Sequence, residues 1–480
     1  MISSPGPFDA PLAVELLPKI SDLEPLLAAL EPHVDAAVLE SGQDVAGTGE
    51  WHVLVAGAVG EAKIIGSGWE WSIGGVREGR GDRDPVAAVA AWWELWRSDL
   101  ALPVVAIDGV DRELPFAGGA IGVFGYELGE QFETVKGPPP TFEAEAFRAM
   151  PDLHLRLYDE AVVIHAASGA AFFVHRHRVK VEERRWWERR AELSAHSSAG
   201  SSDDESVRIA ERVSIDDASY LAAVDDIRSK IERGEVYEVN LTRCHRVDGA
   251  PSAWELYRRL RVAQPVPYAA LLPWSPVGVV SASPECFLRV RGRSIETRPI
   301  KGTAPRTGDP VADATSRETL RTSDKERAEL AMIIDLERND LGRVCRAGSV
   351  EVVEEAALEA YATVYHNVAT VRGELRDEVG PFEVLAATFP GGSITGAPKI
   401  AAMTTIRELE PCPRKAYTGS VGWLGPNGDL ELSIAIRTVI EREGTMYFSV
   451  GGAVTWDSVP EHELAELEAK GRAIFTALRG

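Results

Sequence analysis

A segment with almost no apolar side chains divides this chain into two unequal parts. Residues 194–205 read SAHSSAGSSDDE, in which serine, glycine and aspartate predominate. Such a composition is typical of a flexible connector, because it offers no apolar surface around which the backbone can order. We therefore predict an N-terminal region over residues 1–193, a flexible linker over residues 194–207 and a C-terminal domain over residues 208–480.

Helical and strand-like patterns occur on both sides of the predicted linker. Before it, residues 51–59 have strand character and residues 85–97 helical character, so this part is mixed α and β. After it, Ser214 is placed to cap a helix, and residues 236–244 follow as a strand. Further strand-like runs lie at residues 277–283, 287–290 and 446–450. The sequence predicts an α+β fold with substantial antiparallel sheet.

The charge of the chain excludes several classes of partner. Its 51 basic and 74 acidic side chains give a formal net charge of -23. Binding to nucleic acid or to an anionic membrane needs a basic surface, and no stretch of this sequence supplies one. An anionic substrate must therefore be bound by a few local cations.

The cysteines and the amino end indicate the compartment. Cys244, Cys286, Cys345 and Cys412 form no Cys-x-x-Cys pair, which disfavours a disulfide framework and a zinc site. The amino end has no basic segment followed by an apolar one, and the sequence has no run of about 18 apolar residues. We predict a cytoplasmic protein with reduced thiols.

One lysine lies on a turn flanked by proline and glycine, in the run Arg298-Pro299-Ile300-Lys301-Gly302-Thr303. An amine presented in this way can react with a bound small molecule. A lysine in such a turn is usually a solvated surface residue, so the six residues alone do not indicate catalysis and the interpretation depends on the rest of the sequence.

Two pairs of glutamates have helical spacing. Glu326 and Glu329 lie three residues apart, as do Glu463 and Glu466 in a terminal helix that Pro460 can start. Two such faces brought together form an oxygen-rich site suited to Mg²⁺. The spacing also fits a helix cap at Ser323 and a charged solvent face, so both interpretations stay open.

A glycine-rich loop, FPGGSITGAPK at residues 389–399, precedes another helical pattern. Its backbone N–H groups can face an anion. It is not a nucleotide-binding Walker A loop, because Ala397 stands where the phosphate-binding lysine would be. A purely structural loop fits the sequence as well.

The order of several longer motifs resembles that of the chorismate-utilising enzymes. In the second half these motifs are SPECF (283–287), ETRPIKGTAPR (296–306), DKERAELAMIIDLERNDLGRV (324–344), YHNVATVRGEL (365–375), FPGGSITGAPK, AYTGSVGW (416–423) and LSIAIRT (432–438). In the first half they are VLESG (38–42), FAGGAIGVFGYELGEQFE (116–133) and MPDLHLRLYD (150–159), so the N-terminal region also resembles that of anthranilate synthase component I. The resemblance implies an α+β sandwich of two antiparallel sheets flanked by helices.

Two positions favour one branch of this family. Lys301 stands where the aminodeoxychorismate synthases have lysine and the anthranilate synthases have alanine. Residues 237–241, YEVNL, resemble the Tyr-Gln-Val-Asn-Leu of the same branch. The resemblance thus implies amination of chorismate at C4 on the route to 4-aminobenzoate and folate. Anthranilate synthesis is the alternative enzymatic function. The non-enzymatic alternative is a catalytically silent subunit that binds tryptophan or chorismate.

The resemblance also assigns roles to residues. Lys301 would attack the ring, Glu285 would protonate the departing hydroxyl, and His366 would orient the substrate. Glu329 and Glu466 would hold Mg²⁺, with Glu326 and Glu463 beside it. The substrate-binding residues would be Thr303, Lys399, Tyr417, Arg437, Gly451, Gly452 and Ala453, and a possible tryptophan pocket would include Leu39, Glu40 and Ser41.

The proposed chemistry sets two further expectations. A neutral Lys301 is needed for attack, so burial or nearby cations should lower its pKa. No cysteine lies in a glutaminase motif, so ammonia should come from a separate glutamine amidotransferase subunit. A separate lyase would then act on the product.

Overall fold

The computed structural model describes residues 12–480, apart from residues 44, 46, 76, 99–100, 177–185 and 190–208. The predicted linker over residues 194–207 lies outside the described residues. Within them, none of the helices is long and apolar enough to span a membrane.

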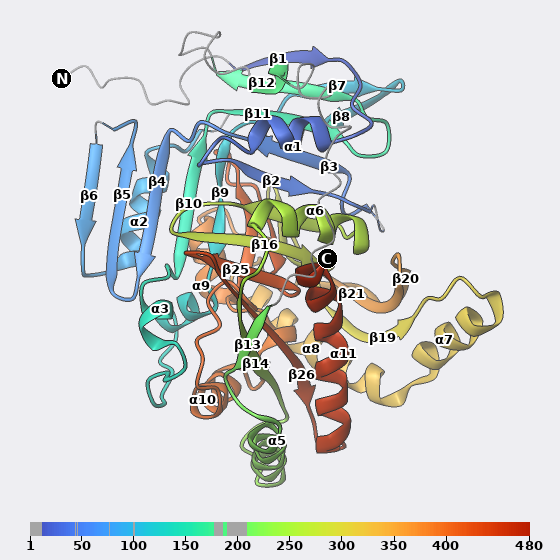
Figure 1. Ribbon diagram of the computed structural model, residues 1–480. Helices are drawn as coiled ribbons and strands as arrows, with labels where there is room; N and C mark the ends of the chain where they lie inside the picture. The colour runs from blue at the N-terminus through green and yellow to red at the C-terminus, as the bar shows by residue number, and fades with distance from the viewer. Residues whose placement is uncertain are drawn as a thin grey trace.

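Two large antiparallel sheets organise the fold (Figure 1). The first sheet has the strand order β1 (Leu12–Leu17), β12 (Ala171–Arg176), β11 (Glu160–His165), β3 (Trp51–Val55), β2 (Ala37–Glu40), β15 (Tyr268–Leu272), β16 (Val277–Ser283), β25 (Thr438–Arg442), β26 (Thr445–Val454), β14 (Glu238–Asp248) and β13 (Ala210–Val213), with β22 (Gly396–Ala397) beside β14.

The second sheet has the order β19 (Ile300–Pro305), β21 (Val364–Glu374), β18 (Ser294–Arg298), β17 (Cys286–Arg291), β24 (Leu430–Ile434), β23 (Ser420–Leu424), β9 (Gly119–Phe124), β10 (Leu153–Tyr158), β4 (Gly60–Ile65), β5 (Gly68–Ile73) and β6 (Arg77–Gly81), with β20 (Glu351–Ala360) beside β21. A short hairpin of β7 (Val104–Ile107) and β8 (Val110–Glu113) lies apart from both.

Strands from both sides of the predicted linker pair within each sheet. In the first sheet β2 pairs with β15, and in the second β9 pairs with β23. One buried apolar cluster contains residues of both sheets, such as Leu54, Leu155, Val239 and Leu432. The predicted α+β sandwich is therefore confirmed, while the division into domains stays a prediction.

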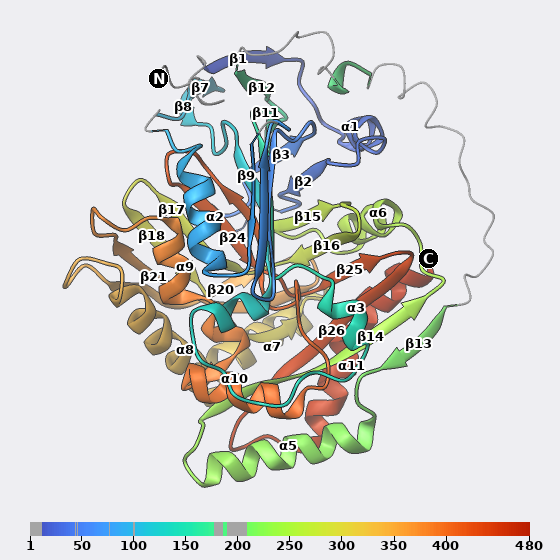
Figure 2. The same cartoon turned by 90° about the vertical axis from the view of Figure 1, so that its left-hand side faces the viewer.

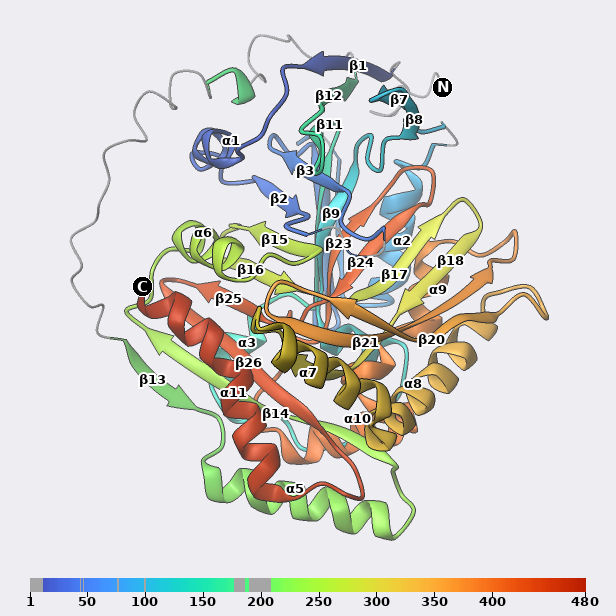
Figure 3. The same ribbon diagram turned by 90° about the vertical axis from the view of Figure 1, so that its right-hand side faces the viewer.

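Helices cover the outer faces of the sheets. Figure 3 shows α5 (Asp217–Glu232) and α11 (Pro460–Arg479) beside β14 and β26, and α8 (Asp324–Gly342) and α7 (Pro310–Thr322) beside β21. Both α7 and α8 also contact β19. Figure 2 shows α2 (Pro85–Glu94) alongside β4 and β5. The remaining helices are α1 (Glu24–Leu30), α3 (Ala144–Arg148), α6 (Ala253–Ala263), α9 (Pro381–Thr388) and α10 (Lys399–Leu409), with short 3₁₀ helices at Tyr126–Gln131, Trp186–Arg189 and Gly392–Ile394.

The start of α5 differs from the prediction. Asp216 caps this helix, because its side chain accepts a hydrogen bond from the Ser219 N–H. Ser214 lies too early in the chain, and its hydroxyl accepts instead from the Cys244 N–H on β14. The prediction that Ser214 caps the helix was therefore wrong, because serine and aspartate compete for the same role. Pro460 begins α11 as predicted.

Candidate active site

Lys301 lies on β19, where it faces the first sheet. Its Nζ donates a 2.6 Å hydrogen bond to Oε1 of Glu238 at the start of β14, and the lysine side chain is only 8% exposed. The register between β19 and β21 shifts between Lys301 and Thr303. Gly302 makes this bulge possible, because its φ is +84° and a Cβ there would lie 3.0 Å from Glu326 Oε2. Lys301 is therefore an interior group rather than a solvated surface lysine.

The pKa of Lys301 contradicts the prediction. Burial alone would lower it, but the carboxylates of Glu238, Glu329 and Glu285 outweigh burial and raise the pKa above its ordinary value. The predicted lowering was wrong because the sequence did not show that carboxylates, rather than cations, surround the amine. Lys301 rests as an ammonium ion held by Glu238.

Glu285 is a buried carboxyl group between β16 and β17. Its Oε1 accepts 2.6 Å from the Ser393 hydroxyl and 3.3 Å from the Ile300 N–H. Burial raises the pKa of Glu285 to about 7 despite these hydrogen bonds and the nearby Lys301 charge. A carboxyl group with such a pKa can carry a proton at neutral pH and donate it.

His366 lies on β21 opposite Thr303. Its Nδ1 is 3.0 Å from Thr303 Oγ1 and 3.2 Å from the Gly302 carbonyl oxygen. Burial and the positive charge of Arg437 lower the pKa of His366 to about 4, so the ring is neutral. Its Nε2 is buried and has no hydrogen-bond partner among the described residues, which leaves one polar atom for a ligand.

The four predicted metal-site glutamates share one neighbour. The negative charges of Glu329, Glu463, Glu326 and Glu466, against the effect of burial, raise the pKa of Lys325. The two helices α8 and α11 therefore bring these carboxylates to one region, while their role as a metal site stays a prediction. Within the described residues, however, no three metal-binding side chains are close enough to hold an ion together.

The individual glutamates differ in their partners. Oε1 of Glu329 is buried and makes no hydrogen bond, although Lys325 Nζ lies 3.7 Å from it, and burial raises the pKa of this group to about 7. Glu463 accepts 2.7 Å from the Ser458 hydroxyl, whereas Glu466 pairs with Lys470 at 2.7 Å and is about half exposed. The Glu329 oxygen without a hydrogen bond and the surplus of carboxylates over amines fit a divalent cation at this place.

The predicted substrate-binding residues lie around the same region. Gly452 is adjacent to α11, because a Cβ there would meet Glu463 Oε2 at 3.5 Å. Gly451 precedes it and Ala453 follows it on β26. Arg437 lies before β25 with a φ of 51°, close enough to His366 to depress its pKa. Tyr417 is buried, and burial raises its pKa above the ordinary range.

Lys399, a predicted substrate-binding residue, is engaged by other groups of the protein. Its Nζ donates to Asp340 Oδ2 at 2.5 Å and to the Thr388 carbonyl at 2.6 Å. These contacts tie the start of α10 to α8 and α9, so the structure gives no support to direct substrate binding by this amine. The Gly392 N–H likewise donates to Glu337 at 3.0 Å, which makes part of the 389–399 loop structural.

Leu39, Glu40 and Ser41 border a separate cavity of about 260 Å³. Glu40 is held by the Tyr257 hydroxyl at 2.5 Å and by Arg261 at 2.8 Å. Trp51, Leu114 and Trp423 contribute apolar surface to the cavity, and Tyr268, Arg289, Arg291 and Glu431 contribute polar surface. Tryptophan binding in this cavity stays a prediction.

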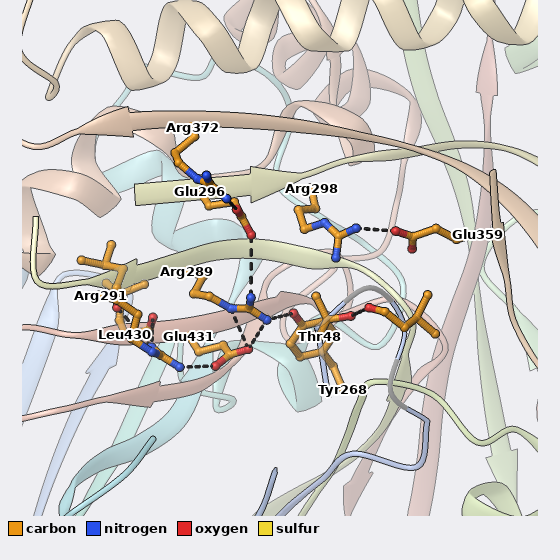
Figure 4. Close-up of polar contacts among 12 residues, drawn as sticks. Thr48, Tyr268, Arg289, Arg291, Glu296, Arg298, Glu359, Arg372, Leu430 and Glu431 are labelled. Atoms are coloured by element: carbon orange, nitrogen blue, oxygen red, sulfur yellow. Dashed lines mark hydrogen bonds and ion pairs between the residues drawn. The ribbon is translucent and has the colours of Figure 1, made fainter. Parts of the chain in front are cut away.

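Charged side chains link the strands beside this cavity (Figure 4). Arg289 on β17 reaches Glu431 on β24 at 3.1 Å and Glu296 on β18 at 3.7 Å. Arg291 reaches Glu431 at 2.6 Å, and Arg372 reaches Glu296 at 2.6 Å. These pairs fix the positions of the polar groups and satisfy most of their charge.

Sequence reasoning missed two residues of the active site. Glu238, the partner of Lys301, was noted only as part of the motif at residues 237–241. Ser393 belongs to the glycine-rich loop, and nothing in its spacing indicates the contact with Glu285. The replacement of the branch's usual glutamine by Glu238 was the one available signal, because a buried carboxylate requires a partner.

Similarity to known proteins identifies the family of this chain. The model of the chorismate binding enzyme family matches residues 81–476, and this chain belongs to that family. Aminodeoxychorismate synthase component 1 of Salmonella typhimurium is 37% identical over 368 residues, which cover 77% of this chain and 78% of the relative. The enzyme of the same name from Bacillus subtilis is 35% identical over 406 residues, 82% of each chain. Anthranilate synthase component 1 of Haloarcula marismortui is 36% identical over 385 residues, 77% of each chain.

Solved structures share the fold. Anthranilate synthase component I from Streptococcus pneumoniae has a TM-score of 0.71 at 25% identity, covering 90% of this chain and 93% of that one. The menaquinone-specific isochorismate synthase from Escherichia coli has a TM-score of 0.68 at 15% identity, covering 99% of this chain and 96% of that one. The two-sheet architecture is therefore that of known chorismate-utilising enzymes.

Replacing Glu285 with Gln should raise the free energy of unfolding, relative to wild type, more at pH 8 than at pH 5. Burial raises the folded pKa to about 7, whereas an unfolded Glu titrates near 4.3. The wild type therefore loses stability as pH rises through this interval, and a neutral amide does not. The free energy of unfolding of E285Q relative to wild type should increase by about 2 kcal/mol between pH 5 and pH 8.

Urea titrations at both pH values measure this difference. Glu461→Gln is the control, because Glu461 is exposed on α11 and should show the same difference at both pH values. An equal difference for E285Q at the two pH values would contradict a raised pKa at Glu285.

Proposed function

We propose that the chain is a Mg²⁺-dependent aminodeoxychorismate synthase component that aminates chorismate at C4. The observation that carries this proposal is the buried amine of Lys301, which lies among Glu238, Glu285 and Glu329. Relatives of this name match more than three quarters of the chain. An amine in that place can form a covalent bond with the substrate before ammonia enters.

Lys301 and Glu285 divide the chemistry of the first step. The Lys301 amine attacks C2 of the ring, the ring double bonds shift, and the bond between C4 and its hydroxyl breaks. Glu285, whose raised pKa of about 7 lets it carry a proton near neutral pH, delivers that proton to the departing hydroxyl. Ammonia then attacks C4 and expels the lysine.

The carboxylate-rich region supplies the cation site. Glu329 and Glu466 would hold Mg²⁺, with Glu326 and Glu463 next to it directly or through water. The bound ion would offset the negative charge of a substrate carboxylate in a region rich in carboxylates. Oε1 of Glu329 supports this assignment, because it is buried and makes no hydrogen bond, with only Lys325 Nζ at 3.7 Å beside it.

Other residues would orient the substrate. Arg437, Tyr417 and the backbone N–H groups around Gly452 would bind the second carboxylate. The neutral His366 would offer its free Nε2 as one hydrogen-bonding atom, with Thr303 fixing the ring. A neutral imidazole at this position orients better than it protonates, since its pKa of about 4 keeps it uncharged.

Ammonia and the following step would come from other proteins. The name component 1 in the relatives supports a separate glutamine amidotransferase subunit as the ammonia source. A separate lyase would convert the product to 4-aminobenzoate for folate, and the chain would act in the cytoplasm.

Anthranilate synthesis is the second candidate function. The anthranilate synthase component 1 from Haloarcula marismortui, at 36% identity, supports this alternative. Lys301 favours C4 amination over it, because an alanine at that position cannot attack the ring. The Lys301, Glu285 and glutamate cluster also argues against a silent regulatory subunit, since such a subunit needs no buried reactive amine.

Replacing Lys301 with Ala should nearly abolish amination at C4 and spare chorismate binding. The amine acts in the covalent step, whereas binding depends on the cation site and on Arg437. Formation of the C4-aminated product should fall at least about 100-fold, equivalent to about 2.7 kcal/mol of transition-state stabilisation. Lys136→Ala, at an exposed lysine, is the control. Normal turnover by K301A to the same product would refute the covalent step.

Glu329→Gln should weaken Mg²⁺ binding about 10-fold or more, because the amide removes one charged ligand. Calorimetric titration of Mg²⁺ into the protein with chorismate measures the affinity, and chorismate consumption after chelation and re-addition of Mg²⁺ measures its consequence. Glu461→Gln, an exposed glutamate on α11, should leave both unchanged. Wild-type Mg²⁺ affinity in E329Q would remove Glu329 from the metal site.

A further inference from the structure

Glu238 is a carboxylate sealed inside the active site. It is 0% exposed, and its Oε1 accepts the 2.6 Å hydrogen bond from Lys301. The Nδ2 of Asn240 is 3.4 Å from the same oxygen. Oε2 of Glu238 is buried without any hydrogen-bond partner among the described residues. A buried carboxylate with one oxygen unsatisfied is costly and needs a physical reason.

The backbone holds Glu238 tightly in this position. Glu238 begins β14 and pairs with Ala397 of β22. Gly396 lets this segment approach, because a Cβ there would lie 2.0 Å from the Glu238 carbonyl oxygen. The carboxylate therefore cannot easily move away from the amine of Lys301 when the active site is in use.

We infer that Glu238 is a further catalytic residue, the internal base that takes the proton of Lys301 as its amine attacks the substrate. This inference rests on the proposed function and deepens it. One N–H bond of the Lys301 ammonium breaks, and the proton moves along the existing hydrogen bond to Glu238 Oε1. The freed lone pair forms the bond to C2 of the ring, and Glu285 gives its own proton to the hydroxyl that leaves C4.

A carboxylate at position 238 lets the lysine become neutral while the number of protons bound by the pair stays the same. The ion pair of Lys301 and Glu238 holds one proton, and so does the reactive state with a neutral amine and a protonated carboxyl group. The protein reaches the reactive state without releasing a proton to water. With glutamine at position 238, the ammonium would first have to lose its proton to solvent, so activity would depend on a higher pH.

Charged side chains of the neighbouring elements also act on the ion pair of Lys301 and Glu238. Glu329 on α8 and Glu285 beside β17 act on Lys301, and Glu466 on α11 is influenced by the Lys301 charge. All three are carboxylates, so all favour the ammonium form of Lys301. None of them is within hydrogen-bond distance of its Nζ in the described structure, whereas Glu238 is.

The test compares Glu238→Gln with the wild type over a range of pH. The full-length protein is assayed with chorismate, Mg²⁺ and ammonium chloride, and the C4-aminated product is measured. The ratio of the two rates is taken at each pH, so that the changing fraction of free ammonia cancels. Glu235→Gln is the matched control, because it makes the same change three residues away at an exposed ion pair with Arg233.

The expected result is a ratio that depends on pH. At pH 7 the kcat of E238Q should be lower by about 10-fold to 100-fold, and the loss should narrow steadily as pH rises. The KM for chorismate should change little, and E235Q should match the wild type at every pH. Thermal unfolding of E238Q should show that the variant is folded.

Two results would overturn the inference. A ratio for folded E238Q that is constant across the pH range would mean that Glu238 only positions the lysine. A rate for E238Q equal to or above wild type at pH 7 would mean that no internal base is needed. Failure of the proposed function looks different, because the wild type itself would then form no C4-aminated product.

Discussion

The ion pair between Glu238 and Lys301 is the interaction on which the active site depends, because it joins the two sheets. Glu238 belongs to β14 of the first sheet and Lys301 to β19 of the second. A buried pair of this kind is costly to form and costly to break, so it fixes how the two strands face each other. The carboxylates of α8 and α11 add to the same field, and together they keep the lysine charged until substrate arrives.

The pKa values of the two titrating groups, Lys301 and Glu285, are both raised, for different reasons. The pKa of Lys301 is raised by surrounding carboxylates, and that of Glu285 is raised to about 7 mainly by burial. Near neutral pH, Lys301 is therefore an ammonium ion, and Glu285 carries a proton in a substantial fraction of the molecules. The covalent step requires Lys301 to lose its proton and Glu285 to donate its own, and each group has its own hydrogen-bond partner, Glu238 for Lys301 and Ser393 for Glu285.

Much of the fold and of the site could be predicted from the sequence, for identifiable reasons. The resemblance to the chorismate-utilising enzymes implies the antiparallel sandwich and the approach of Glu326 and Glu329 to α11, whereas helical spacing indicates only that the two glutamates of each pair share a helix face. The pKa of Lys301 could not be predicted, because it depends on Glu238, Glu285 and Glu329, which are distant from Lys301 in the sequence and approach it only in the fold. Lys399 shows the same limit. Its charge is evident from the sequence, but its engagement with Asp340 depends on how α10 meets α8.

The identity of the aminated carbon is the central claim, and product identification tests it most directly. The purified protein is incubated with chorismate, Mg²⁺ and ammonium, with and without an added aminodeoxychorismate lyase, and the products are identified by mass spectrometry and chromatography against standards. Our account predicts 4-aminobenzoate only when the lyase is present. Formation of anthranilate and pyruvate without the lyase would contradict it.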